Sequence, residues 1–103
     1  MYKPASFDPV QATCVLDLTG SNEKTDLHQI LAQTFDFPDY YGRNWAALWD
    51  CMTDLACSYK KLTIQVRGVI GMEKEWYESC ADLFALLDDL SKEYPHISIQ
   101  YLP

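Results

Sequence analysis

The sequence predicts a small α/β domain, a three-stranded parallel sheet with packed helices. Three short runs are typical of strands: residues 12–18, 62–67 and 97–102. Helical patterns separate them, and such crossover connections allow neighbouring strands to run parallel. The length of 103 residues indicates one domain. We expect residues 12–103 to form this domain and residues 1–11 to be a loose N-terminal arm.

The first strand and the first helix are indicated by apolar patterns. Residues 12–18 form a nearly continuous apolar run, and residues 19–22 have the composition of a turn. Thr25 or Asp26 can cap the helix that follows, and Pro38 closes the segment. The apolar residues at helical spacing in this helix are Leu27, Ile30, Leu31 and Phe35.

The connection after the first helix covers residues 36–43. Pro38 fixes one backbone dihedral there, and Gly42 is free to take a positive φ. We expect a surface loop that carries two tyrosines, Tyr40 and Tyr41.

A second helix is predicted from its N-cap, Asn44, to about Cys57. Its inward stripe consists of Trp45, Leu48, Met52 and Leu55. At about 100° per residue, the opposite face contains Ala46, Asp50, Thr53 and Asp54, with Trp49 at the margin. An aromatic ring beside a carboxylate is therefore presented to solvent.

The last third of the chain predicts strand, helix and strand. Residues 62–67 and 97–102 alternate apolar and polar side chains. Between them one helix is expected, which Pro95 ends. Its stripe is the clearest in the chain: Trp76, Cys80, Leu83, Phe84, Leu87, Leu90 and Tyr94.

The charge balance favours a basic protein as partner. Fifteen acidic residues against eight lysines and arginines give a net charge of −7, which opposes direct binding of nucleic acid. No apolar stretch is long enough to span a membrane, and the first residues lack the apolar centre of a signal peptide. We expect a cytoplasmic protein that is monomeric before it binds its partner.

The residues do not assemble into a catalytic or metal site. His28 and His96 lie apart in the predicted elements and are interpreted as structural. The four cysteines form no C-x-x-C pair and are expected to be reduced, buried thiols, without metal or cofactor. We predict that the protein is not an enzyme. A thiol enzyme that uses Cys51 or Cys57 stays as a remote alternative.

A binding surface is the better hypothesis, and the alternative is that Tyr40, Tyr41 and Trp49 are core or partly buried rings. Aromatic and charged residues concentrate in the segment Tyr40 to Asn44 and in the helix that follows it. Tyrosine and tryptophan dominate binding hot spots because they bring large, rigid contact areas at low entropic cost. Asp50, beside Trp49, can enter a cationic pocket of a partner.

The string DLHQILAQTFDFPDYYGRNWAALWDCMTDL resembles the barstar family, intracellular protein inhibitors of secreted microbial ribonucleases. The family's hallmark is Pro-x-Tyr-Tyr-Gly-x-Asn followed by Ala-Leu-Trp-Asp-Cys. The matching residues are Pro38, Tyr40, Tyr41, Gly42, Asn44, Ala47, Leu48, Trp49, Asp50 and Cys51. Similarity in element order extends over residues 14 to 102, and only the central string is specific.

The resemblance implies an immunity-type inhibitor that occludes the basic active site of a toxic ribonuclease, as in a toxin–antitoxin pair. By this resemblance Asp50 is the central contact and Tyr40 the aromatic anchor, and Asp89 is the matching carboxylate of the last helix. The expected partner-binding residues are Tyr40, Tyr41, Gly42, Asn44, Trp45, Ala46, Trp49, Asp50, Thr53 and Asp89.

Two of the departures from the archetypal inhibitor change the charge of the surface. Ala46 stands where the archetype has a second carboxylate, and Arg43 stands where it has an acid before the capping Asn. One interface charge pair is therefore missing. The alternative is a barstar-like interaction or regulatory module that binds a protein other than a nuclease.

Overall fold

The computed structural model describes residues 11–103. Its elements are, in chain order, β1 (Gln11–Asp17), α1 (Leu27–Phe35), α2 (Trp45–Ser58), β2 (Lys61–Arg67), α3 (Lys74–Ser79), α4 (Ala81–Glu93) and β3 (Ile97–Leu102). The predicted α/β class is confirmed. The N-terminal arm expected at residues 1–11 lies outside the described residues except for Gln11, which belongs to β1.

The three strands form one parallel sheet in the order β1-β2-β3. Gln11 is paired with Lys61 at one end of the β1–β2 pair, and Leu62 with Ile97 in the β2–β3 pair. Parallel neighbours need crossover connections, which are supplied here by α1 with α2 and by α3 with α4. The predicted topology is therefore correct.

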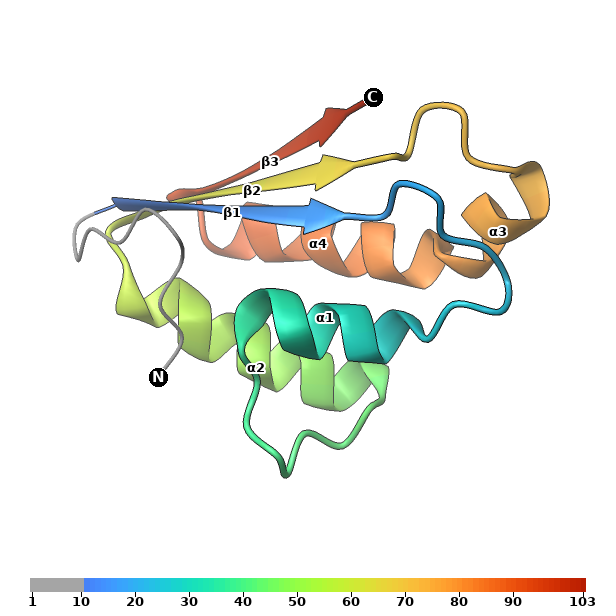
Figure 1. Cartoon of the computed structure of the whole chain (residues 1–103). Helices are drawn as coiled ribbons and strands as arrows, with labels where there is room; N and C mark the ends of the chain where they lie inside the picture. Colours follow the sequence, from blue (N-terminus) through green and yellow to red (C-terminus); the bar gives the residue numbers. More distant parts are fainter. Residues whose placement is uncertain (1–10) are drawn as a thin grey trace.

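The helices and the sheet enclose one hydrophobic core. α1 packs against β1, α4 packs against β3, and α2 packs against α4. Figure 1 shows α1, α2 and α4 on one face of the sheet, with the α1–α2 connection projecting away from it. Residues of β1 alternate between buried and exposed, as expected for a sheet with one covered face. The largest fully buried side chains are Phe35, Leu16, Leu18, Leu31, Leu48, Met52, Leu62, Ile64, Leu83, Leu87, Leu90 and Val66.

The single helix predicted between the last two strands is wrong, because the structure divides it at Cys80. The backbone of Cys80 has φ −90° and ψ 0°, and its N–H donates to the carbonyls of Trp76 and Tyr77. Trp76 is fixed across the fold by a 2.8 Å hydrogen bond from its indole N–H to the Ser21 hydroxyl. The apolar stripe nevertheless stays in phase, since Trp76, Cys80 and Leu83 are all buried.

Candidate functional site

The connection between α1 and α2 forms a tight turn that displays Tyr40. Asp36 ends α1 in the left-handed conformation, with φ 52°. The Tyr41 N–H then donates to the Pro38 carbonyl at 2.9 Å, which closes a four-residue turn. The Tyr40 side chain is 87% exposed at this turn. An aromatic side chain of this exposure is available to a partner.

The start of α2 is capped as predicted. The Ala47 N–H donates to the Asn44 side chain at 2.8 Å. The positive φ expected at Gly42 is wrong, because the residue with φ 54° is Arg43. A Cβ at Gly42 would lie 3.3 Å from the Cβ of Ala47, a tight contact that a small shift of Ala47 would relieve.

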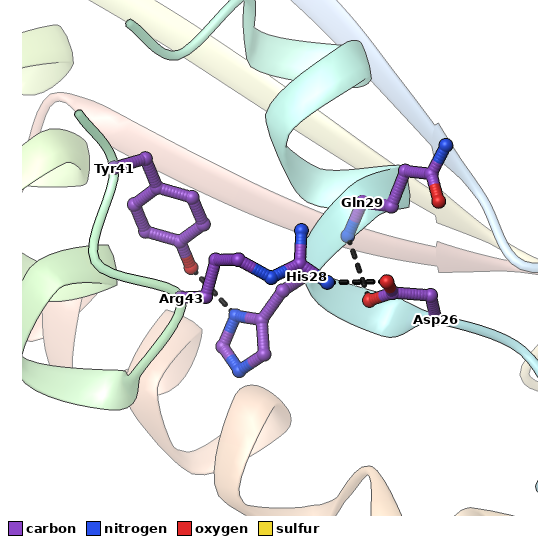
Figure 2. Close-up of polar contacts among 5 residues, drawn as sticks. All are labelled: Asp26, His28, Gln29, Tyr41 and Arg43. Carbon is purple, nitrogen blue, oxygen red and sulfur yellow. Dashed lines mark hydrogen bonds and ion pairs between the residues drawn. The ribbon is translucent and has the colours of Figure 1, made fainter. Parts of the chain in front are cut away.

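Tyr41 lies under the turn rather than on its surface, so the prediction of two exposed tyrosines is wrong for this residue. It is 8% exposed, and its ring packs against Phe37 with 4.8 Å between centroids. Its hydroxyl forms a 2.7 Å hydrogen bond with Nδ1 of His28, which lets a polar group be buried (Figure 2). Burial raises the pKa of Tyr41 to about 12, so its hydroxyl stays protonated at neutral pH.

The outward face of α2 agrees with the predicted helical spacing. Ala46, Asp50 and Asp54 are exposed, and Thr53 is half-buried. Trp49 is half-buried and packs against the core from its margin. The face that carries Asp50 is therefore open to a partner.

A groove of about 750 Å³ lies between the α1–α2 connection and α2. Its apolar wall includes Phe37 and Leu55, and its polar groups include four carboxylates. The groove is lined by Phe35, Asp36, Phe37, Pro38, Asp39, Tyr40, Asp50, Cys51, Asp54, Leu55 and Ser58.

The groove has a negative potential that is not neutralised within the described part of the chain. The ion pairs among residues 11–103 are Arg43 with Asp26 and Lys92 with Asp88, and none of these residues lines the groove. Asp50 and Asp54 are one helical turn apart, where like charges repel. The pKa of the Cys51 thiol is raised by burial first, and then by the charges of Asp54 and Asp50. The groove is suited to a cationic group.

The structure brings only part of the predicted binding set into this groove. Tyr40 and Asp50 line it, whereas Asn44, Ala46 and Trp49 do not line it and lie on α2 or at its start. Gly42 and Trp45 are also outside its lining, Thr53 lies on the outward face of α2, and Asp89 is exposed on α4. The contact role of these nine residues, and of the buried Tyr41, stays a prediction.

Sequence patterns did not single out Asp36, Asp39 or Asp54 as members of one site. Helical spacing predicts an outward position for Asp54. Its place four residues after Asp50 is the sequence signal that could have joined these two carboxylates in one site. Asp36 and Asp39 join it only because the connection folds back along α2.

The chemical groups agree with a binding surface. No cluster of three or more potential metal ligands occurs within residues 11–103. The cysteines of this region are thiols rather than disulfides, but the expectation that all are buried is wrong for Cys57, which is exposed, and is met only in part by the half-buried Cys51. No helix in this same region is long and apolar enough to cross a membrane.

Comparison with known proteins decides the family. The model of the family described as "Barstar (barnase inhibitor)" matches residues 11–101. The chain belongs to the barstar family. The predicted resemblance is thus confirmed across both crossover units of the fold.

A curated relative is similar over a short segment. It is "Putative ribonuclease inhibitor YrdF" of Bacillus subtilis (strain 168), 67% identical over 27 residues. The match covers 26% of this chain and 30% of the relative. Members of the barstar family are non-enzymatic inhibitors that bind barnase-like ribonucleases, in agreement with the prediction that this chain is not an enzyme.

Proposed function

We propose that this protein inhibits a toxic ribonuclease by inserting its acidic α2 face and the Tyr40 turn into the enzyme's basic active site. The observation that carries the proposal is the groove, which is lined by Tyr40, Asp50 and Asp54 together with apolar side chains. An enzyme that cleaves RNA must attract phosphates, so its active site is basic. A surface of carboxylates can occupy such a site in place of the substrate's charge.

The proposed contact uses two kinds of interaction. The exposed ring of Tyr40 supplies rigid apolar area, and Asp50 accepts charge-assisted hydrogen bonds from arginine, lysine or histidine of the enzyme. Asn44, Trp49 and Thr53 surround this centre on α2. Tyr41 supports the surface from beneath. We place Asp89 of α4 at the rim of the same surface.

The biological setting of the proposal is an immunity protein. A ribonuclease toxin that acts inside a cell must be blocked where RNA is present, so we propose that the inhibitor acts in the cytoplasm. The net charge of −7 speeds encounter with a basic toxin. We expect a one-to-one complex because the surface is formed by a single α1–α2 unit.

The test is a titration of the protein into a barnase-like ribonuclease while RNA cleavage is followed. We expect stoichiometric inhibition. Asp50→Ala should weaken binding by at least about 30-fold, which corresponds to about 2 kcal/mol, because it leaves cationic groups of the enzyme without a partner. The melting temperature should be nearly unchanged, since Asp50 is exposed.

Glu78→Ala is the matched control for this titration. It removes the same charge from an exposed helical position on α3, outside the groove. We expect it to leave inhibition close to that of the original protein. Equal losses in both variants, or full inhibition by Asp50→Ala, would contradict the central role of Asp50.

A second function is favoured by one observation. Ala46 supplies no charge on the exposed face of α2, so the acidic groups are displaced toward Asp54 and the groove. This shift fits a basic partner that differs from barnase-like ribonucleases, including a protein that is not a nuclease. Absence of inhibition together with one-to-one capture of such a protein, lost in Asp50→Ala, would support this alternative.

A further inference from the structure

Arg43 is the one described cation in the segment between Asp36 and α2, next to the acidic groove. Its position suggests that it would repel a basic partner. The structure directs its guanidinium elsewhere, toward the carboxylate of Asp26 at the start of α1 (Figure 2). The same carboxylate accepts a hydrogen bond from the Gln29 N–H as the N-cap of α1.

We propose that the Asp26–Arg43 ion pair and the His28–Tyr41 hydrogen bond form a clamp that holds the Tyr40 turn in its partner-binding conformation. In this proposal Arg43 and His28 are positioning residues rather than contacts. The inference rests on the proposed function, because it assigns a role within the same binding surface.

The clamp joins the segment that follows Tyr40 to the start of α1. Figure 2 shows Tyr41 and Arg43, from the connection, pointing toward Asp26 and His28 at the start of α1. Tyr41 follows Tyr40 directly, and Arg43 precedes the cap of α2. The His28 ring also lies 5.1 Å from the ring of Trp45, between centroids, at the first residue of α2. The first turn of α1 thus contacts the connection and the beginning of α2.

The backbone of Arg43 is in a conformation that needs such support. A φ of 54° lies in the left-handed region, which is unfavourable for a residue with a long side chain. Residues persist in that region when surrounding contacts fix them. The ion pair with Asp26 and the following cap at Asn44 supply these contacts.

The clamp also neutralises a charge. Arg43 holds the pKa of Asp26 below its ordinary value, chiefly through their hydrogen bond, and the carboxyl group is ionised at neutral pH even without this shift. Because its charge is balanced by Asp26, the Arg43 guanidinium reduces the negative potential of the groove less than an unpaired cation would. A stable turn also lowers the entropy that the partner must remove on binding.

A double-mutant cycle tests the clamp. Asp26→Asn removes the charge and keeps a good N-cap for α1, and Arg43→Gln removes the charge at the same backbone strain. We expect each variant to weaken binding to the ribonuclease about two- to fivefold, mainly through faster dissociation, as for an exposed ion pair. The double variant should be no weaker than either single variant. Tighter binding by Arg43→Gln, or additive losses, would overturn the proposal.

Amide hydrogen exchange in the unbound protein tests the clamp without a partner, so it distinguishes a failure of the clamp from a failure of the proposed function. We expect faster exchange at Tyr41 and Ala47 in Asp26→Asn and Arg43→Gln, with an unchanged global unfolding temperature. Lys92→Gln, which breaks the other described ion pair, with Asp88 on α4, is the control and should leave these amides unaffected. If the original protein binds no ribonuclease, the proposed function fails, while this exchange still decides whether the clamp exists. Unchanged exchange in both variants would exclude it.

Discussion

Tyr40 and Tyr41 are adjacent in the chain and lie in opposite environments. Tyr40 is 87% exposed beside the acidic groove, whereas Tyr41 is 8% exposed and hydrogen-bonded to His28. Both residues belong to the turn that is closed by the hydrogen bond from the Tyr41 N–H to the Pro38 carbonyl. One tyrosine is thus accessible to a partner, and the other belongs to the core.

This division predicts opposite phenotypes for the two alanine variants. Tyr40→Ala should weaken ribonuclease inhibition at least about tenfold and leave the free energy of unfolding nearly unchanged, because an exposed aromatic ring contributes mainly to an interface. Tyr41→Ala should lower the free energy of unfolding by about 3 kcal/mol or more, because it empties a buried site. Urea unfolding and RNA-cleavage titration measure the two quantities. A stability loss in Tyr40→Ala would contradict its assignment.

The stability of the protein should depend on the ionisation of His28. Its pKa is lowered from 6.5 by burial first and by the charge of Arg43 second, while Asp26 acts in the opposite direction. Tyr41, the other titratable contact, stays neutral because its pKa is about 12. The unfolded chain therefore binds a proton more readily than the folded chain.

From this sign, the contribution of His28 is complete above pH 6.5 and is lost as the pH falls toward the lowered pKa. As the pH falls from about 7 to about 5, the free energy of unfolding should decrease less in His28→Gln than in the original protein. Urea unfolding at a series of pH values measures this difference. Parallel pH profiles for the two proteins would show that His28 does not contribute.

The sequence predicted features that depend on local pattern. The bounds of β3, the cap at Asn44 and the outward position of Asp50 follow from alternation, capping chemistry and the helical repeat. The break at Cys80 did not follow, because it accompanies a hydrogen bond between Trp76 and Ser21, which are 55 residues apart.

The acidic groove and the clamp also depend on contacts between residues that are far apart in the sequence. His28 and Tyr41 are 13 residues apart, and Asp26 and Arg43 are 17 residues apart. Local propensity favours glycine for a positive φ, so it pointed to Gly42 rather than Arg43. Gly42 is distinguished instead by the close approach of the Ala47 side chain, which the sequence pattern does not reveal.

The cysteines should differ in reactivity. Cys57 is exposed, Cys51 is half-buried, and Cys14 and Cys80 are buried. Burial raises the pKa of Cys51, and that of Cys80 to about 11, which lowers their thiolate fraction at pH 8. We expect the Cys57 thiol alone to react rapidly with an alkylating reagent in the native protein. This rapid reaction should disappear in Cys57→Ser. Rapid modification of Cys51 instead would favour the remote alternative of a thiol enzyme.

Gly68 should be the least replaceable glycine among the described residues. Its φ is 86°, and a Cβ there would lie 2.5 Å from the backbone nitrogen of Thr19, where β1 and β2 end. Gly71 has a similar φ of 89° and open space around it. A substitution at Gly71 therefore measures the cost of a positive φ without steric overlap. We expect Gly71→Ala to lower the free energy of unfolding by about 1 kcal/mol and Gly68→Ala by at least about twice as much. Equal effects in urea unfolding would exclude the steric overlap.

The negative groove predicts a salt-dependent association rate. Charges attract a basic enzyme over distances comparable to the Debye length, about 8 Å at physiological salt, so added salt should slow association more than it speeds dissociation. Asp54→Asn should reduce this salt dependence, because Asp54 lines the groove with Asp50. Glu78→Gln removes an equal charge from α3 and tests whether net charge alone is responsible. Stopped-flow association at increasing salt measures both effects. An equal reduction in the two variants would assign steering to net charge, whereas a larger reduction in Asp54→Asn would assign it to the groove.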